Sequence, residues 1–219
     1  MLTQSEENYL KVIYNLSGAS KKIVSTNAVA EAINSKAASA TDMIQKLNKK
    51  GLVDYHKYQG VSPSVSGKKE ALNVIRKHRL WEVFLVQNLK FKWDEVHEVA
   101  EQLEHVDSPM LIEQLDKFLG YPKYDPHGDP IPNANGEMES NPTDTLNILK
   151  PGNKCRVICA KDSSSSFLLY LDKIQISLGA EIEVLDYFEY DGSYSVSVNN
   201  SGAISLSSKV AENIFIDKL

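Results

Sequence analysis

Six histidine and glutamate residues recur at helical spacing between residues 76 and 108. They are His78 and Glu82, followed by His97, Glu101, Glu104 and His105. At 3.6 residues per turn, each of the two sets falls on one face of a helix. Imidazole nitrogens and carboxylate oxygens so grouped are the ligands of borderline and hard divalent cations. For one His–Glu pair a solvated ion pair is the better interpretation, but six such residues on two neighbouring helices favour a metal site.

Two further groups of ligand type lie outside these helices. The segment 120–137, GYPKYDPHGDPIPNANGE, is rich in proline, glycine and asparagine, which predicts a rigid irregular turn. It carries Asp125 and His127, and Asp162 stands at the start of a serine-rich loop. The alternative is an ordinary loop whose polar residues face water.

The helices that would position these groups are three in number. The apolar periodicity predicts helices over residues 66–88, 93–104 and 109–118, with Trp81 and Phe84 in a core or a dimer surface. We therefore expect a helical metal-binding and dimerisation domain at residues 71–140.

The N-terminal part has the element order of a winged helix-turn-helix. Helices are expected at Ser5–Leu16, with Ser5 as the N-cap, at Ser25–Ile33 and at Thr41–Lys50, the last preceded by a linker, NSKAASA. A hairpin follows between Leu52 and Val65. This order predicts a DNA-binding domain at residues 1–70, in which the third helix enters the major groove and the hairpin lies along the phosphates.

Charge and side-chain size at this end agree with DNA as the partner. Residues 1–80 hold thirteen basic and six acidic residues, whereas the rest of the chain holds eleven and twenty-three. A basic N-terminal part and an acidic remainder indicate that a polyanion binds only the N-terminal part. The small or polar residues expected near base edges are Lys36, Ala38, Ser39, Ala40, Thr41 and Asp42, and the lysines expected at phosphates are Lys46, Lys49, Lys57, Lys68 and Lys69. The alternative is a small helical domain with a solvated basic surface.

The C-terminal part changes to a β pattern. Strands are expected near Lys154–Ala160, Glu181–Tyr187, Tyr194–Val198, Gly202–Leu206 and Asn213–Ile216, with a short helix at Phe167–Ile176 and a flexible Ser163–Ser166. The fold class is therefore mainly α with a small all-β domain, a barrel at residues 143–219.

The composition bears on where in the cell the protein is located. No apolar run is long enough to span a bilayer, the start MLTQSEENYL lacks the pattern of a signal peptide, and Cys155 and Cys159 give no disulfide framework. We expect a cytoplasmic protein without a membrane partner.

The whole chain, from residue 2 to residue 219, resembles the DtxR/MntR family of metal-dependent transcriptional repressors. The motifs that carry the resemblance are NYLKVIYNL, RKHRLWEVFL, WDEVHEVAEQLEHVDS and PHGDPIP. The resemblance implies a homodimer that binds Mn²⁺ or Fe²⁺, then binds a palindromic operator and represses metal-uptake genes. It also implies the C-terminal SH3-like (FeoA-like) domain that only some members have.

The resemblance further implies two metal sites. One uses Glu82, either with His78 and His97 or, as in the three-domain manganese regulators, with Asp125, His127 and Asp162. The other uses Glu101, Glu104 and His105 with Asn8 of the first helix, and can involve His78. The chain departs from the pattern at Asn8, where manganese members have Asp and iron members have Met, and at Asp125, where some relatives have Cys. Ligands so rich in carboxylate favour Mn²⁺, with Fe²⁺ second.

Two alternatives stay open at this point. One is a metal-independent winged-helix regulator, in which the His/Glu cluster is only a charged face. The other is a metalloenzyme, although the chain has no HExxH pattern, no nucleophile elbow and no glycine-rich phosphate loop.

Overall fold

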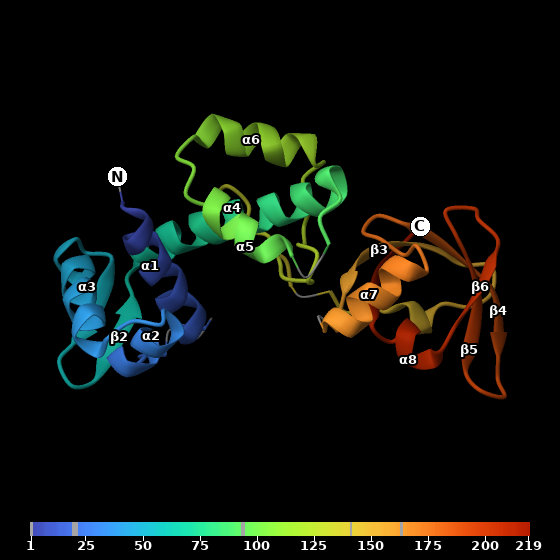
Figure 1. Ribbon diagram of the computed structural model, residues 1–219, viewed down its shortest axis with the longest axis horizontal. Coiled ribbons are helices and arrows are strands. Elements are labelled where there is room, and N and C mark those ends of the chain that lie inside the picture. The colour runs from blue at the N-terminus through green and yellow to red at the C-terminus, as the bar shows by residue number, and fades with distance from the viewer. Residues whose placement is uncertain (1, 19–21, 93–94, 141, 163) are drawn as a thin grey trace. The chain divides into compact units, whose positions relative to one another are not determined.

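The computed structural model describes residues 2–18, 22–92, 95–140, 142–162 and 164–219 (Figure 1). The chain forms two compact units. The first comprises Met1–His78, Leu103–Asp107 and Pro132–Glu137, and the second comprises Arg79–Gln102, Ser108–Ile131 and Met138–Leu219. No described helix has both the length and the apolar character needed to cross a membrane.

The first unit contains the predicted winged helix-turn-helix. Its elements are α1 (Gln4–Ser17), α2 (Thr26–Ala32), α3 (Ala37–Lys49), the hairpin strands β1 (Val53–His56) and β2 (Gly60–Pro63), and the start of α4 (Val65–Leu89). The strands pair antiparallel from Val53 opposite Pro63 to His56 opposite Gly60. The expected element order is confirmed.

Two expected helix starts were wrong. Helix α1 is capped by Thr3 rather than Ser5, because the Thr3 hydroxyl accepts a hydrogen bond from the backbone of Glu6 and the Glu6 carboxylate accepts one from the backbone of Thr3. Helix α3 starts at Ala37 rather than Thr41, so most of the expected linker is helical. Its alanine-rich residues have high helix propensity.

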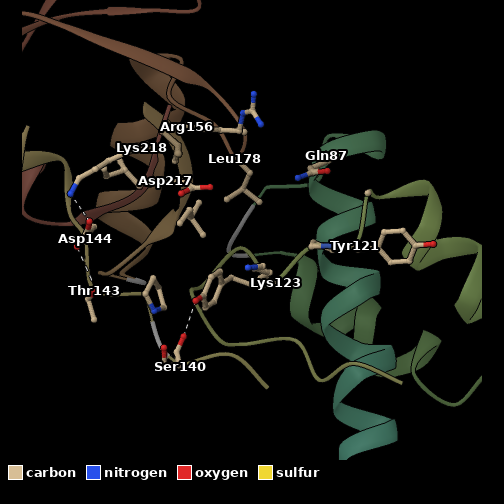
Figure 2. A pocket seen from close by; sticks show the side chains of 18 residues that line it. Gln87, Tyr121, Lys123, Ser140, Thr143, Asp144, Arg156, Leu178, Asp217 and Lys218 are labelled. Carbon is tan, nitrogen blue, oxygen red and sulfur yellow. Dashed lines mark hydrogen bonds and ion pairs between the residues drawn. The ribbon is translucent and has the colours of Figure 1, made fainter. Parts of the chain in front are cut away.

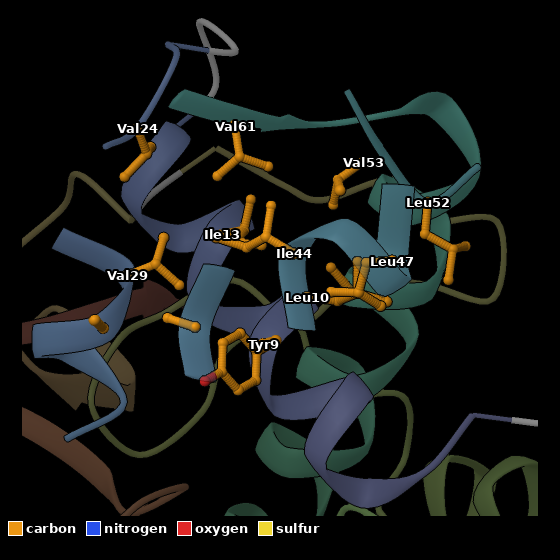
Figure 3. Packing of buried hydrophobic residues seen from close by; sticks show 13 residues of the cluster. Tyr9, Leu10, Ile13, Val24, Val29, Ile44, Leu47, Leu52, Val53 and Val61 are labelled. Atoms are coloured by element: carbon orange, nitrogen blue, oxygen red, sulfur yellow. The ribbon is translucent and has the colours of Figure 1, made fainter. Parts of the chain in front are cut away.

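A buried apolar core fixes α3 against its neighbours. Leu10 and Ile13 of α1 meet Ile44 and Leu47 of α3, and all four are fully buried (Figure 3). Ala40 is also fully buried, so its expected place near base edges was wrong. The exposed residues of α3 thus lie on a helix whose inner face is set by packing.

Gly67 permits the close contact between α4 and the segment before β1. A Cβ atom at this position would lie 1.7 Å from the backbone oxygen of Leu52. The first turn of α4 therefore approaches this segment at a distance that only glycine allows.

The second unit continues α4 and adds α5 (Val96–Leu103) and α6 (Pro109–Phe118). Leu80 and Val83 pack with Ile112 and Leu115 of α6 and with Ile131. Trp81 and Phe84 border this core, with their rings edge to face at 5.8 Å, as expected of core residues. The expected helix 93–104 was too long at its end, because Glu104 lies in the turn after α5; its first two residues, 93 and 94, lie outside the described part.

The same unit holds a five-stranded antiparallel sheet in the order β6-β5-β4-β3-β7. Its strands are β3 (Lys154–Ala160), β4 (Glu181–Phe188), β5 (Ser193–Val198), β6 (Ala203–Leu206) and β7 (Ile214–Lys218). Three short helical segments accompany it: the 3₁₀ turn η1 (Leu146–Ile148), α7 (Ser165–Lys173) and α8 (Ser208–Ala211).

The expected fold class, mainly α with a small β domain, is confirmed. The expectation of a flexible serine run was wrong for Ser165 and Ser166, which open α7 after an N-cap at Ser164; residue 163 lies outside the described part. Serine favours the N-cap and first turn of a helix, which explains the difference.

Candidate metal centre

A buried carboxylate, Glu104, is the centre of the first group of ligand-type residues. This group, which we call the Glu104 group, consists of Glu7 and Lys11 of α1, His78 of α4, and Glu104 and His105 of the turn after α5. All five residues belong to the first unit.

The Glu104 carboxylate is fully buried and receives two basic side chains. The Lys11 ammonium group donates to both carboxylate oxygens, at 2.7 and 2.8 Å, and His78 Nδ1 lies 2.6 Å from Oε2. Burial alone would raise the pKa of Glu104, but the His78 hydrogen bond and the Lys11 charge outweigh it and hold that pKa below its usual range. Glu104 is therefore an ionised carboxylate, as a metal ligand must be.

Glu7 supplies the second carboxylate of the group. His105 Nδ1 makes a short contact with Glu7 Oε2, and Lys77 Nζ lies 3.7 Å from Oε1. Asn8, the expected ligand from this helix, is exposed, and its assignment stays a prediction. Glu7 was missed because neighbouring helix positions differ by about 100° in direction, and spacing alone does not say which of two adjacent polar residues faces inward.

A second group surrounds Glu82 in the second unit. This Glu82 group consists of Glu82, His97, Glu101 and His127. Glu82 is 2% exposed, and its Oε1 lies 3.3 Å from His97 Nδ1 and 3.8 Å from His127 Nε2. His97 is 60% exposed and also contacts Glu101 at 3.5 Å, so one edge of the group is open to solvent.

Asp125 adds a further buried carboxylate to the second unit. Burial and the negative charge of Glu82 raise the pKa of Asp125, while Arg79, 3.4 Å away, opposes that rise. Asp125 Oδ1 accepts hydrogen bonds from the backbone N–H groups of His127 and Asp129. These bonds fix the turn that carries His127. A rigid turn is what the proline-rich sequence predicts.

Two buried carboxylates near one another, with imidazoles at one side, have the chemistry of a divalent cation site. Like charges in a buried place repel, and a cation relieves that repulsion. The donor set of oxygens and nitrogens fits a hard or borderline ion. Cys159 belongs to the same unit, and burial raises the pKa of its thiol to about 12.

The remaining predicted ligands are placed as follows. His78 and Glu82 lie one turn apart on α4 and so share a face of that helix. The Asp162 carboxylate accepts a hydrogen bond from the backbone of Ser164 at 2.9 Å. Its role as a ligand stays a prediction.

The predicted DNA-contacting residues lie on the outer side of the first unit. On α3 and just before it, Lys36, Ala38, Ser39, Asp42, Lys46 and Lys49 are exposed, and Thr41 is half-buried with its hydroxyl donating to the backbone of Ala37. Lys57 is exposed at the tip of the hairpin, where its ammonium group lies 5.0 Å from the ring centre of Tyr58. Exposure on a helix and at a hairpin tip is what groove and phosphate contacts require.

The second unit also has a cavity of about 570 Å³ that is separate from these groups (Figure 2). Tyr121, Lys123, Asp144, Arg156 and Lys218 are among its lining residues. No predicted ligand lines it, so it takes no part in the predicted metal sites.

Comparison with known families places three matches along the chain. Residues 1–61 match "Iron dependent repressor, N-terminal DNA binding domain", and residues 64–133 match "Iron dependent repressor, metal binding and dimerisation domain". Residues 145–218 match "FeoA domain".

Individual relatives agree with these matches. The chain is 34% identical over 125 residues to the HTH-type transcriptional regulator MntR of Oceanobacillus iheyensis, covering 57% of this chain and 84% of that protein. It is 32% identical over 118 residues to an uncharacterized HTH-type transcriptional regulator of Methanocaldococcus jannaschii, covering 54% of this chain and 94% of the relative.

Solved structures extend the similarity to the full length. One, described as a manganese-dependent transcriptional repressor in complex with manganese, is 38% identical with a TM-score of 0.62, and the match covers 98% of this chain and 100% of the other. Another, the manganese regulator SloR, is 33% identical with a TM-score of 0.57, and both chains are covered completely.

Proposed function

Because the chain belongs to the iron-dependent repressor family, also called the DtxR/MntR family, we propose that Mn²⁺, ahead of Fe²⁺, activates it to bind a palindromic operator as a homodimer. As a member, it is a metal-dependent transcriptional repressor and not an enzyme. The observation that carries the proposal is the pairing of buried carboxylates with imidazoles from distant segments, in a chain whose first unit is a winged helix.

The ligand chemistry supports manganese. Both groups offer carboxylate oxygens and imidazole nitrogens. Hard ligands of this kind suit Mn²⁺ and Fe²⁺, although Zn²⁺ would bind more tightly in a test tube. Solved relatives described with manganese, and a repressor described as iron-dependent, agree with this choice.

We assign two sets of ligands. Glu82 forms the first, either with His78 and His97 or with Asp125 and His127, and Asp162 is kept as a candidate addition to the latter. His78, Glu104 and His105 form the second, together with Glu101 and the predicted Asn8, or with Glu7, which contacts His105 in the structure.

The functional division that we propose follows the predicted boundaries. Residues 1–70 bind DNA, residues 71–140 hold the metal and the dimer surface, and residues 143–219 form the SH3-like domain. Exposed apolar residues on and just after α6 support a dimer surface there: Met110, Leu111, Phe118 and Tyr121. A DNA-bound repressor works where the DNA is, so we place the protein in the cytoplasm.

The residues suggest how a cation changes DNA binding. When bound, the ion supplies positive charge to carboxylates that otherwise rely on lysine and histidine. Glu7, His78 and His105 bring α1, α4 and the turn after α5 together around Glu104. A ligand acts only through a difference in affinity between two states, so the donors must fit the ion better in the DNA-binding state. Two α3 helices of a dimer would then meet half-sites about one DNA turn apart.

A metal-titrated gel shift tests the proposal. Purified protein is mixed with a palindromic operator duplex and increasing Mn²⁺, with Fe²⁺ under anaerobic conditions and Mg²⁺ as comparisons. We expect binding at low Mn²⁺, at a stoichiometry of two chains per palindrome. Equal binding with and without chelator would instead identify a metal-independent regulator, and the absence of any DNA binding would refute the proposal.

A further inference from the structure

Glu6 is adjacent in sequence to Glu7 of the Glu104 group, but its carboxylate contacts lysines at the end of α3. Its carboxylate is fully buried, and Oε1 lies 2.6 Å from Lys50 Nζ and 3.1 Å from Lys46 Nζ. The Lys46 and Lys50 side chains are 51% and 39% exposed. One buried carboxylate therefore holds two lysines at the end of the helix that carries the predicted base contacts.

The Glu6 carboxylate is also fixed in place by a second contact. It forms the capping box of α1 with Thr3, in which Oε2 accepts a hydrogen bond from the Thr3 backbone N–H at 2.9 Å. The two lysines thus face an internal carboxylate whose position is set by the start of α1.

The two lysines are poised between this internal anion and an external one. Each lysine has a long flexible stem. Its ammonium group contacts the buried Glu6 carboxylate, while part of its side chain is exposed to solvent. DNA phosphate attracts the same ammonium groups, and each lysine that pairs with a phosphate releases condensed counterions. A lysine held by Glu6 contributes less to this release.

We propose that Glu6 competes with DNA phosphates for Lys46 and Lys50 and so limits the sequence-independent affinity of the DNA-binding domain. This role rests on the proposed DNA binding but is independent of which metal activates the protein. Glu6 therefore lowers the affinity for any duplex through the phosphate contacts, while contacts from the first half of α3 to base edges are left unchanged.

The salt dependence of binding gives the measurable consequence. Each additional phosphate pair steepens the slope of log K against log salt by about 0.9. Release of both lysines would therefore steepen the slope by up to about 1.8. Between about 50 mM and about 200 mM salt, the variant would lose up to about 12-fold more affinity than the wild type does.

The test uses Glu6→Gln in the full chain. Glutamine also serves in a capping box, so α1 keeps its N-terminal hydrogen bonds. The matched control is Glu31→Gln, which changes the net charge equally at an exposed position of α2. Binding to a duplex without a palindrome is measured by fluorescence anisotropy, without metal, from about 50 mM to about 200 mM salt.

We expect tighter binding at low salt and a steeper slope for Glu6→Gln, and the wild-type slope for Glu31→Gln. Adding Lys46→Gln and Lys50→Gln to Glu6→Gln should remove the gain. A wild-type slope, or weaker binding with a shallower slope, would overturn the proposal and identify Glu6 as a purely structural residue; circular dichroism checks that the variant is folded. The proposed function fails separately, if the wild-type protein binds no palindromic operator in the presence of Mn²⁺.

Discussion

Replacing Lys11 by glutamine should strengthen Mn²⁺ binding at the Glu104 group. The Lys11 ammonium group binds both oxygens of a fully buried carboxylate, and the lysine side chain itself is 13% exposed. A cation that binds Glu104 must therefore displace an existing positive charge. Lys11 and the metal compete for the same oxygens.

The size of the effect follows from the burial of the pair. Removing one partner of a buried ion pair costs about 3–5 kcal/mol. His78 still faces Glu104 in the variant, so the lower figure of about 3 kcal/mol applies. This loss affects the metal-free state and not the state in which the ion has replaced the lysine. At about 1.4 kcal/mol per tenfold, Mn²⁺ affinity should rise by about 100-fold.

Calorimetric titration with Mn²⁺ and thermal unfolding with and without Mn²⁺ measure this. The variant should unfold at a lower temperature without metal and gain more from its addition than the wild type does. Lys22→Gln, an equal change of charge at an exposed position, is the control and should leave both quantities unchanged. Equal Mn²⁺ affinity of Lys11→Gln and wild type at every site would refute the competition.

Three further changes test other parts of the structure. Glu82→Gln should reduce operator affinity at limiting Mn²⁺ by about tenfold or more and lower the pKa of Asp125, whose rise depends partly on Glu82; an unchanged carboxyl titration by NMR would contradict this. The lowered pKa of Glu6 means that its stabilisation is complete above about 4.5 and is lost as pH falls towards about 2. The free energy of unfolding of Glu6→Gln, measured with urea, should lack this acid-dependent loss, which is about 1–2 kcal/mol after allowance for the half-exposed lysines. A loss of stability at acid pH equal to that of the wild type would contradict the assignment. Gly67→Ala should cost about 1–3 kcal/mol of unfolding free energy because its Cβ would meet the Leu52 backbone, whereas Gly202→Ala, in open space, should cost less; equal costs would count against the close contact.

The winged helix could be predicted because its signals are local. Apolar residues such as Ile44 and Leu47 repeat at helical spacing, and the hairpin returns over a short turn. The errors occurred at helix ends, where several residues could begin or end the helix. Ala37 could open α3 as well as Thr41, and which one does so depends on packing that spacing does not reveal.

The candidate metal site was predictable in part. Glu82, Glu104 and the histidines have a recognisable spacing, and the structure brings them into contact in two groups. Lys11 and Arg79 were not predicted as partners of Glu104 and Asp125, because a basic residue on a helix is usually solvated. Only the folded chain shows that Lys11, ninety-three residues away in sequence, ends on the Glu104 carboxylate.

The first turn of α1 carries two glutamates with different partners. Glu6 binds lysines of α3, while Glu7 binds His105 in the turn after α5 and lies near Lys77 of α4. Adjacent positions of a helix point about 100° apart, so a rotation of α1 that changes one set of contacts must change the other. A shift in the charge around Glu7 and Glu104 can therefore reach the lysines of α3 through a single helical turn. Leu10 of α1 packs with Ile44 of α3 in the same core, so this rotation would move both helices' contacts together.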